Sequence, residues 1–399
     1  YIDIKNSDYI ILLLSFGERL NVLNGLRNLG LVFDKGSDDI FLSLCNGNNI
    51  RLHKALGMDC LDDLVYELHG ASPLLNLIFN QRYGIGADDY LFSDEELIEE
   101  SNGLGLYRMQ RLAGLGYMTN SEIEQWNPLQ LGPFNAQNQF AYLTTGEKGL
   151  FDVVPFDIVC KHGDTVLEAE GDYIESGYYV YDYEGINDTS TDQIIMETSV
   201  PYDMDLYIAI DNGDYAYSHI WIDDEKLTFI PVQHYRQTYH LGKLKTGQSI
   251  RICTEYTNVG RAGTIWYHFG NYNEEVFQKV YDVLSKNVYE IDEMDSDYID
   301  GHIHADKDGI MVTSIQAVDG FSVFVDNKEV EYKTIGKTFI GVPIEQGEHR
   351  IEFKYITPYF KEGLYASIGG LLIYIILCVY TGLRRKTDSQ NEKESIAAE

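Results

Sequence analysis

An uncharged apolar stretch near the C-terminus is the feature that most constrains how this chain can fold. Residues Leu364 to Leu383 read LYASIGGLLIYIILCVYTGL and contain no charged side chain. At 1.5 Å per residue, a helix of this length spans about 30 Å, the hydrocarbon thickness of a bilayer. A core helix of a soluble protein would show a polar stripe, and none is visible here. The stretch therefore predicts one transmembrane helix over residues 364–383.

The charges that follow this stretch set its orientation. Arg384, Arg385 and Lys386 come directly after it, and basic residues beside a membrane span stay on the cytoplasmic side. We therefore expect residues 1–360 to lie outside the plasma membrane. Residues 384–399 are expected to form a short, disordered cytoplasmic tail.

The other end of the chain shows no export signal. The first residues, YIDIKNSDYIILLLSFGERL, lack a basic leader, and the apolar run Tyr9 to Leu14 is too short to span a bilayer. That run is typical of a buried strand. Because the region before the helix has to cross the membrane, we expect the chain to be the C-terminal part of a longer membrane protein with further helices upstream.

Charge and cysteine content exclude several classes of function. The chain of 399 residues has a net charge of -33, so its surface repels nucleic acid and anionic headgroups, and we exclude nucleic-acid binding. The five cysteines are scattered and match no Cys/His zinc spacing. Neither a structural metal nor a disulfide framework is predicted, although a pair between Cys45 and Cys60 is left open.

Periodicity predicts an α+β, mostly β, extracytoplasmic part. Residues 1–148 mix helix and strand patterns and are expected to form a mixed α/β domain. Residues 149–272 consist of short period-two strands separated by Gly, Asp and Asn turns, which predicts an antiparallel β-sandwich or jelly roll. A connecting helix over 273–287 leads to a second β-sandwich unit over 288–360.

The two β units also resemble each other in sequence. IWIDDEKLTF followed by LGKLKTGQSIRICTEY in the first unit is similar to FSVFVDNKEVEY followed by IGVPIEQGEHRIEFKY in the second. Each pair shows a strand, an Asp-Asp or Asp-Asn turn and a further strand. Because the match slips by a residue or more, it indicates a shared sandwich architecture rather than a proven duplication.

Local signals predict three helices. Ser72 followed by Pro73 is a helix start with an N-cap and a proline at the first position. Ser93 and Glu96 have the spacing of a capping box, for a helix that would end at Gly103. In the connecting segment, an apolar face is predicted from Val276, Val280, Val283 and Leu284.

The stretch WNPLQLGPFNAQNQF is the strongest candidate for a binding site. Amides offer paired donors and acceptors, and aromatic rings offer flat apolar faces, which together are the groups that hold sugars. The alternative is a buried junction between domains, in which the amides bind loop backbone. The candidate glycan contacts are Trp126, Phe134, Asn135, Gln137 and Asn138.

Two further clusters have weaker metal-binding patterns. His302 and His304 fall on one strand face near Asp300 and Asp306, which resembles half a metal site. The acidic loop from Tyr181 to Asp192 suits calcium but lacks the glycine and glutamate of an EF-hand. A polar strand face and a solvated loop are the favoured explanations.

The strand segment GVPIEQGEHRIEFKY gathers charges but is explained by alternation. His349, Ile351, Phe353 and Tyr355 fall on one face, and His349 is predicted to be a structural histidine where the strand enters the core. The other face, with Arg350, Glu352 and Lys354, is predicted to be solvated. Since GxSxG, HExxH, P-loop and dinucleotide motifs are also missing from the sequence, no catalytic residue, metal or cofactor is predicted.

Four stretches resemble the YfhO-type family of multi-pass bacterial membrane proteins. They are GASPLLNLIFNQRYGIG at 70–86, LYRMQRLAGLGYMTNSEI at 106–123, PFNAQNQFAYLTTG at 133–146 and, most closely, the segment from GIMVTSIQ to GLLIYI at 309–375. The chain departs from the family pattern at Phe321, where tryptophan is usual, and at Asn327, where glycine is common in the turn.

The resemblance implies a glycosyltransferase that transfers sugars from a polyprenyl-phosphate donor to a surface polymer such as lipoteichoic acid of Gram-positive bacteria. The family's catalytic acid is in an early extracytoplasmic loop, so the resemblance transfers no catalytic residue to this chain. The membrane, the donor and the polymer would be its partners through the full-length protein, and this region would support or bind the acceptor. The alternative is a single-pass, surface-anchored β-sandwich protein for binding or adhesion.

Overall fold

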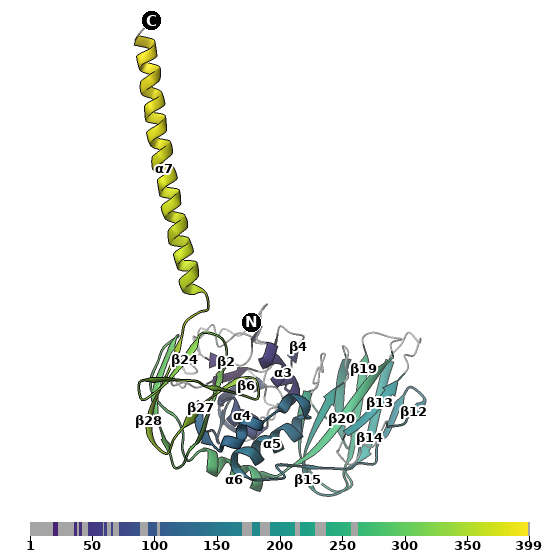
Figure 1. Cartoon of the computed structure of the whole chain (residues 1–399). Helices are drawn as coiled ribbons and strands as arrows, with labels where there is room; N and C mark the ends of the chain where they lie inside the picture. Colours follow the sequence, from purple (N-terminus) through teal and green to yellow (C-terminus); the bar gives the residue numbers. More distant parts are fainter. Residues whose placement is uncertain are drawn as a thin grey trace.

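The computed structural model shows a body built largely of β-sheets, from which one long helix projects (Figure 1). This confirms the α+β, mostly β, class. The predicted strand at Tyr9–Leu14 and Cys45 lie outside the described part of the chain. The structure describes residues 19–22, 36–37, 40–41, 47–58, 60–61, 65–66, 72–87, 95–101, 104–169, 178–183, 192–211, 216–227, 237–256 and 262–397.

In the residues that the structure describes, the N-terminal part combines two small sheets with three helices. One sheet has the order β2-β1-β6-β8-β7 and pairs β1 in parallel with β2 and β6. The second sheet has the order β3-β5-β4. The strands are β1 (Arg19–Val22), β2 (Gly36–Ser37), β3 (Ile40–Phe41), β4 (Cys60–Leu61), β5 (Val65–Tyr66), β6 (Gln81–Ala87), β7 (Glu95–Ser101) and β8 (Leu104–Met109); the helices are α3 (Gly47–Leu56), α4 (Pro73–Ile78) and α5 (Pro133–Thr145), with 3₁₀ turns η2 (Ser121–Gln125) and η3 (Pro128–Gln130).

The two N-terminal helix signals have opposite outcomes. Ser72 caps α4 as predicted, because its Oγ accepts a hydrogen bond from the Leu75 amide at 3.3 Å. The capping-box prediction is wrong, because residues 95–101 form strand β7, paired with β8. Glu96 reaches across to Arg108 at 2.6 Å and does not cap a helix. Cross-strand pairing with β8 outweighs a capping signal that consists of only two residues. Ser93 and Gly103 lie outside the described residues.

The middle β unit is an antiparallel sandwich, as its period-two pattern predicts. One sheet has the order β10-β20-β15-β18, with β13 also paired to β20, and the other has the order β12-β11-β14-β19-β16-β17. Their inner faces enclose a core of aliphatic and tyrosine side chains, among them Ile208, Ile252 and Tyr267. The strands are β10 (Phe151–Val153), β11 (Val159–His162), β12 (Thr165–Leu167), β13 (Tyr178–Tyr183), β14 (Asp192–Ser199), β15 (Met204–Asp211), β16 (Ala216–Ile222), β17 (Glu225–Lys226), β18 (Gln237–Leu244), β19 (Ser249–Tyr256) and β20 (Gly263–Tyr272).

The C-terminal β unit is a second antiparallel sandwich. Its sheets have the orders β21-β22-β28-β24-β25 and β26-β27-β23-β9, and residues such as Met311, Ile351 and Phe353 fill the space between them. The strands are β21 (Glu290–Met294), β22 (Tyr298–Ala305), β23 (Gly309–Gln316), β24 (Phe321–Val325), β25 (Lys328–Val330), β26 (Lys333–Ile335), β27 (Phe339–Ile344) and β28 (Gly347–Tyr355).

One strand of this second sandwich comes from the N-terminal part of the sequence. Strand β9 (Gly116–Thr119) pairs antiparallel with β23. On its other side, the Met118 amide donates to the Asn287 carbonyl at 2.9 Å and the Tyr289 amide donates to the Gly116 carbonyl at 2.8 Å. The C-terminal sandwich therefore extends across the boundary predicted at residue 148.

The two sandwiches repeat the same order of strands. In chain order, β14, β15, β16, β17, β18 and β19 correspond to β22, β23, β24, β25, β27 and β28, and each set has the same pairings. Asp223 and Asp326 occupy the same turn with φ of 53° and 52°. Each accepts a backbone amide of the neighbouring long strand, from Ser249 at 2.9 Å and from Arg350 at 3.1 Å. In the first unit β20 flanks β15, and in the second β9 takes that place beside β23.

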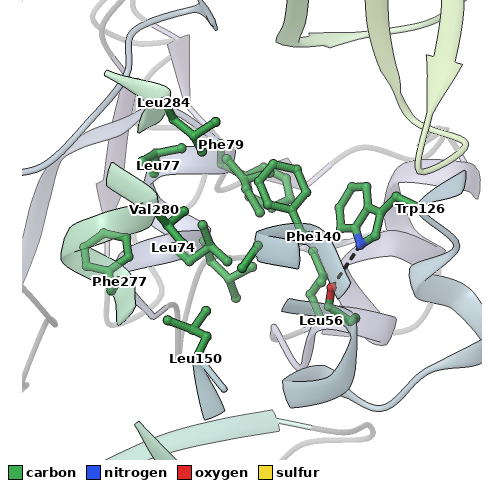
Figure 2. Close-up of a cluster of buried hydrophobic side chains, with 14 of the residues drawn as sticks. Leu56, Leu74, Leu77, Phe79, Trp126, Phe140, Leu150, Phe277, Val280 and Leu284 are labelled. Carbon is green, nitrogen blue, oxygen red and sulfur yellow. Dashed lines mark hydrogen bonds between the residues drawn. The ribbon is translucent and has the colours of Figure 1, made fainter. Parts of the chain in front are cut away.

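A hydrophobic core joins the three parts (Figure 2). Helices α5 and α6 (Glu274–Leu284) meet in it, together with Leu74 and Leu77 of α4. In α6 the buried stripe runs through Phe277, which is fully buried, whereas Val283 is 48% exposed. The predicted apolar face is therefore correct for Val276, Val280 and Leu284 and wrong for Val283, which lies at the edge of the stripe.

Helix α7 (Phe360–Ala397) projects from the sandwich on the side opposite to α6 (Figure 1). Its segment Phe360–Arg384 has a mean hydropathy of 2.0, and none of it is covered by the rest of the chain, so it is long and apolar enough to cross a membrane. The tail was predicted to be disordered, but the helix continues through residue 397. Its Arg, Lys, Gln, Glu and Ala residues are good helix formers that extend a helix already nucleated.

Candidate functional site

The aromatic members of the predicted glycan stretch lie inside the protein. Trp126 is 3% exposed, donates its indole N–H to the Ala136 carbonyl at 2.9 Å and packs edge-on against Phe140 (Figure 2). Phe134 is 2% exposed, and its ring lies 4.7 Å from Phe151 of β10 and 4.6 Å from His268 of β20. These two rings join α5 to its neighbours and present no surface to a ligand.

The amides of the same stretch also bind the protein. Gln137 is 1% exposed, accepts a hydrogen bond from the Ser72 hydroxyl and donates to the Pro133 carbonyl at 3.2 Å. Asn138 exchanges two hydrogen bonds of 2.8 Å with the backbone of Phe151 and so ties α5 to β10. Asn135 is half-buried, and glycan contact by its side chain stays a prediction.

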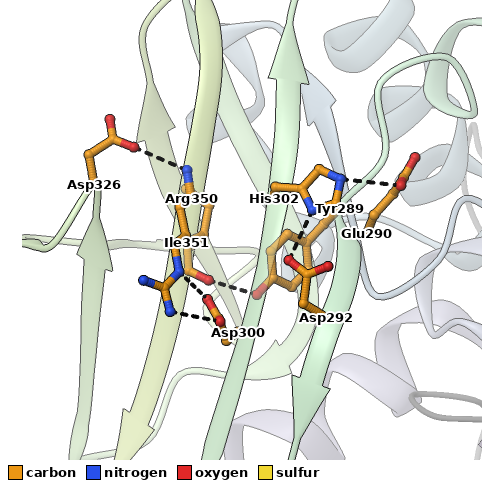
Figure 3. A network of polar contacts seen from close by, with 8 residues as sticks. All are labelled: Tyr289, Glu290, Asp292, Asp300, His302, Asp326, Arg350 and Ile351. Atoms are coloured by element: carbon orange, nitrogen blue, oxygen red, sulfur yellow. Dashed lines mark hydrogen bonds and ion pairs between the residues drawn. The ribbon is translucent and has the colours of Figure 1, made fainter.

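The charged face of the last strand forms a network (Figure 3). The Arg350 guanidinium binds both carboxylate oxygens of Asp300 at 2.9 Å, from β28 to β22. Glu352 lies 2.6 Å from the Lys354 ammonium and 3.5 Å from Arg350. The hydrogen bond from Arg350 holds the pKa of Asp300 below its usual range.

This face is less exposed than alternation predicted. Ile351 and Phe353 point into the core as expected, at 0% and 1% exposure. Glu352, however, is only 6% exposed, and so the prediction that it is solvated is wrong. The long side chains of Arg350 and Lys354 lie over it, and the Lys354 ammonium also lies 4.4 Å from the Phe324 ring centre.

The histidines of the sheet face bind carboxylates. His302 lies 3.0 Å from Asp292 and 3.3 Å from Glu290, and the hydrogen bond to Asp292 raises its pKa. His304 lies 2.7 Å from Glu348 and 3.2 Å from Asp306. Both nitrogens of each ring are therefore engaged with acids. Within the described ranges, no group of three or more His, Cys, Asp or Glu side chains is arranged to hold a metal ion.

His349, predicted to be a structural histidine, is bonded to two other segments of the sandwich. Its Nδ1 lies 2.8 Å from Asp326 and its Nε2 lies 3.1 Å from the Glu345 carbonyl, with 15% of the side chain exposed. It therefore joins the turn between β24 and β25 to the start of β28. The acidic loop Tyr181–Asp192 belongs to the described part only at its ends, in β13 and β14.

The thiols that can be described outside the membrane helix are protected. Cys160 is 1% and Cys253 is 9% exposed, and burial raises the pKa of Cys160 to about 12 and that of Cys253 to about 11. Protonated thiols of this kind are poor nucleophiles. In the described parts of the chain, the side chains of the Arg350 network and the histidines of the sheet face are thus bonded within the protein, and the described thiols outside α7 are inert.

The link between the sandwich and α7 is short. The Tyr355 amide donates to the Asp297 carbonyl at 2.8 Å, and the Ile356 amide donates to the Gly320 carbonyl at 3.0 Å. Helix α7 starts at Phe360. Residues 357–359 alone separate the two, a reach of about 10 Å when extended. Tyr359 and Phe360 are 83% and 61% exposed, and tyrosine favours the membrane interface.

The chain matches a protein family over most of its length. A family described as bacterial membrane protein YfhO matches residues 19–367, from strand β1 into helix α7. This chain belongs to the YfhO family. The assignment agrees with the resemblance found in the sequence, and it identifies the YfhO chain as a membrane protein, in keeping with the apolar segment of α7.

Solved structures resemble the YfhO chain only weakly. A family two carbohydrate esterase from Clostridium thermocellum is 11% identical, with 30% of this chain and 33% of that chain covered and a TM-score of 0.19. A glycosyl hydrolase family 2 member from Bacteroides cellulosilyticus is 10% identical over 52% and 32% of the two chains, with a TM-score of 0.20. A family 29 carbohydrate-binding module is 13% identical over 31% and 89%, with a TM-score of 0.19.

At these TM-scores the likeness establishes no shared overall fold. The chain spans about a third of the length of the first solved structures that it matches, at 33% and 32%. No curated protein matches it in sequence.

Proposed function

We propose that this chain is the extracytoplasmic region of a multi-pass YfhO-family glycosyltransferase that adds sugars from a polyprenyl-phosphate donor to a cell-surface polymer such as lipoteichoic acid. In this proposal the region supports or binds the acceptor polymer at the outer face of the plasma membrane, and the tail of α7 is cytoplasmic. The observation that carries the proposal is a family fold attached to an apolar helix by residues 357–359.

Two properties favour a supporting role over a catalytic one. The charged side chains around Arg350 are paired, and the described thiols outside α7 are buried, so these groups supply neither a free acid nor a nucleophile. A tether of three residues keeps the sandwich close to the bilayer, where a lipid-linked donor is available. The region is thus suited to holding a polymer near a transfer site formed by other parts of the protein.

Charge limits how an acceptor is held. With a net charge of -33, the surface repels a polymer backbone of phosphate groups. Contact through the neutral sugars or polyol parts of the acceptor is therefore favoured over contact through its phosphates.

The proposal is tested by polymer composition. We expect deletion of the gene to lower the sugar content of lipoteichoic acid and the wild-type gene to restore it. An insertion of Gly-Ser repeats after Thr357 should restore less, because it frees the sandwich from its tether. The same insertion after Asp388, beyond the membrane segment, is the matched control and should restore fully. Unchanged polymer sugar in the deletion strain would sink the proposal, and loss of surface binding without that change would favour an adhesion protein.

Sidedness is tested by cysteine labelling in intact cells. Val166 lies in an edge strand and is 60% exposed, so Val166→Cys should react with a membrane-impermeant maleimide. Ser389→Cys should react only after the cells are permeabilised. The opposite pattern would place the sandwiches in the cytoplasm and exclude an acceptor role at the cell surface.

A further inference from the structure

A groove of about 900 Å³ opens at one end of the middle sandwich. It is bounded by the segment before β11, the end of β14, the turn between β16 and β17, and the start of β19. This volume lies toward the upper end of the range for small-ligand sites, about 300–1,000 Å³. Its polar lining residues include Asp157, Glu197, Ser199, Asp223, Asp224 and Arg251.

The groove continues onto the outer face of the sheet. Strand register sets Glu197 of β14 opposite Arg251 of β19, and Arg251 opposite Trp221 of β16. The alternate residues of these strands, such as Met196 and Ile252, are fully buried in the sandwich core. Because side chains alternate across a strand, Glu197, Arg251 and Trp221 form one outward row that starts in the groove.

A flat ring and a cation are adjacent in this row. The Arg251 guanidinium carbon lies 4.4 Å from the centre of the Trp221 ring, and the Lys226 ammonium lies 5.5 Å from it. The two cations fix the ring on the sheet surface, and cation–π contact leaves the guanidinium N–H groups free to donate at their edges.

Some polar side chains of the groove are hydrogen-bonded within the protein, and others are available to a ligand. Asp223 accepts hydrogen bonds from the Ser249 amide at 2.9 Å and from the Gln248 side chain at 3.0 Å, so it serves the turn. The side chains of Glu197 and Asp224 have no hydrogen bond or ion pair within the described chain, and the side chain of Arg251 has none there beyond its contact with Trp221. The groove thus offers open acceptors and an open donor beside an aromatic ring.

We propose that this groove binds a neutral glycan, with sugar hydroxyls bonded to Arg251 and Glu197. The Trp221 ring, which has the Arg251 and Lys226 cations over it, holds the guanidinium in place. Hydroxyl groups donate and accept, so they satisfy a carboxylate and a guanidinium together. Four carboxylates, Asp157, Glu197, Asp223 and Asp224, face one guanidinium, and this excess of negative charge disfavours phosphate or uronate groups. The inference deepens the proposed function, on which its biological setting rests, by naming neutral sugar residues as the part of the acceptor that is bound.

The test measures binding to the full chain in lipid nanodiscs by isothermal titration calorimetry. The probes are maltohexaose, cellohexaose and chitohexaose as neutral glycans, and a hyaluronan hexasaccharide and poly(glycerol phosphate) as anionic ones. At least one neutral probe should bind with a Kd below about 1 mM. Trp221→Ala and Arg251→Met should each weaken that binding at least about tenfold, and the anionic probes should bind no better than buffer.

Trp266→Ala is the matched control, because Trp266 is 37% exposed and lies in the other sheet of the same sandwich. It should leave the Kd unchanged. Arg251→Met keeps the apolar stem of the side chain, so its result stands even where Trp221→Ala lowers the yield of folded protein.

Failure of all three neutral probes to bind, equal binding by Trp221→Ala, or preferential binding of an anionic probe would each overturn the inference. None of these results alters the sugar content of lipoteichoic acid in the deletion strain, so failure of the groove and failure of the proposed function can be told apart.

Discussion

At the residue scale, the surroundings of a side chain depend on neighbours that are distant in sequence. Glu352 lies on the outward face of β28, yet it is 6% exposed because Arg350 and Lys354 lie over it. Asp300 on β22 is similarly 7% exposed and is held by the forked guanidinium of Arg350. The hydrogen bond from Arg350, on the neighbouring strand, holds the pKa of Asp300 below its usual range.

Replacement of Asp300 measures how much this network contributes to the free energy of unfolding. We expect Asp300→Asn to lower the free energy of unfolding by about 1–2 kcal/mol, because a charge-assisted pair with one half-exposed partner is lost. Denaturation of the full chain in detergent would measure the change. Glu96→Gln is the control, since the Glu96–Arg108 pair is about half-exposed on both sides, and it should lower the free energy of unfolding less than Asp300→Asn does. Equal effects of the two variants would contradict the argument.

Alanine substitutions of Trp126 and Asn135 distinguish a role in packing from a role in binding the acceptor. Trp126→Ala removes a ring that is 3% exposed, and we expect a loss of about 3–5 kcal/mol in stability and little folded protein. Asn135→Ala should change stability by less than about 0.5 kcal/mol. Protein level and thermal unfolding check both. If Asn135→Ala then lowers polymer glycosylation at a normal protein level, its side chain contacts the acceptor.

At the element scale, β9 explains how a sandwich next to a membrane helix completes its sheet. In the middle unit, β20 follows β19 and pairs with β15. In the C-terminal unit, β28 leads into α7, so no later strand is available beside β23. Strand β9, from residues 116–119, fills that edge. The N-terminal part and the membrane-proximal sandwich are therefore coupled in stability.

This coupling predicts a long-range effect of one proline. Met118→Pro removes the amide that donates to the Asn287 carbonyl at 2.9 Å and should destabilise the sandwich by about 2–3 kcal/mol. Hydrogen exchange of amides in β23 and β27 should become faster, although both strands lie far from residue 118 in sequence. Met118→Thr keeps the amide and should leave exchange nearly unchanged. Wild-type exchange in the proline variant would disprove the role of β9.

At the scale of the whole molecule, paired carboxylates set the response to acid. Lys245 holds the pKa of Asp203 at about 2, and Lys286 holds that of Asp306 at about 2. The usual value for aspartate is about 3.9. Such groups stabilise the fold above the unfolded pKa, and this contribution is lost as pH falls through the folded pKa. Protonation also relieves repulsion among the many acidic side chains, which stabilises the fold. The difference in stability between two variants is therefore more informative than the stability of one protein alone.

The expected pH dependence is that of the stability difference between wild type and a variant, and two variants are compared. The stability difference between wild type and Asp306→Asn should be constant above about pH 5 and should be largely lost as the pH falls to about 2. Urea midpoints measured between those values would show it. Asp319→Asn is the control for loss of a charge alone, because the Asp319 side chain accepts no hydrogen bond within the described residues. A pH-independent difference for Asp306→Asn would contradict the pairing.

The contribution of His302 to stability changes with pH in the opposite direction. Its pKa is raised by Asp292, so its contribution is fully present below the unfolded value of about 6.5 and is lost as pH rises through the folded pKa. The carboxylate pairs and this histidine together favour a mildly acidic stability maximum.

The sequence by itself determined the features that depend on local order. An uncharged run of one bilayer's length, period-two strands and the Ser72 cap can each be recognised from neighbouring residues, because hydrophobic transfer and backbone geometry act locally along the chain. The resemblance to the YfhO family, carried by the same segments, was likewise visible and is borne out by the match over residues 19–367.

Only the tertiary structure decided which segments meet. Strand β9 completes a sheet made of residues beyond 300, Trp126 is buried by Phe140 and the backbone of Ala136, and Glu197, Arg251 and Trp221 form one row from three strands. Pairing in a sheet has no fixed separation in sequence, so burial and site geometry depend on contacts that no local pattern encodes. For this reason the sequence pattern indicates the Trp126 stretch, and the groove is visible only in the folded chain.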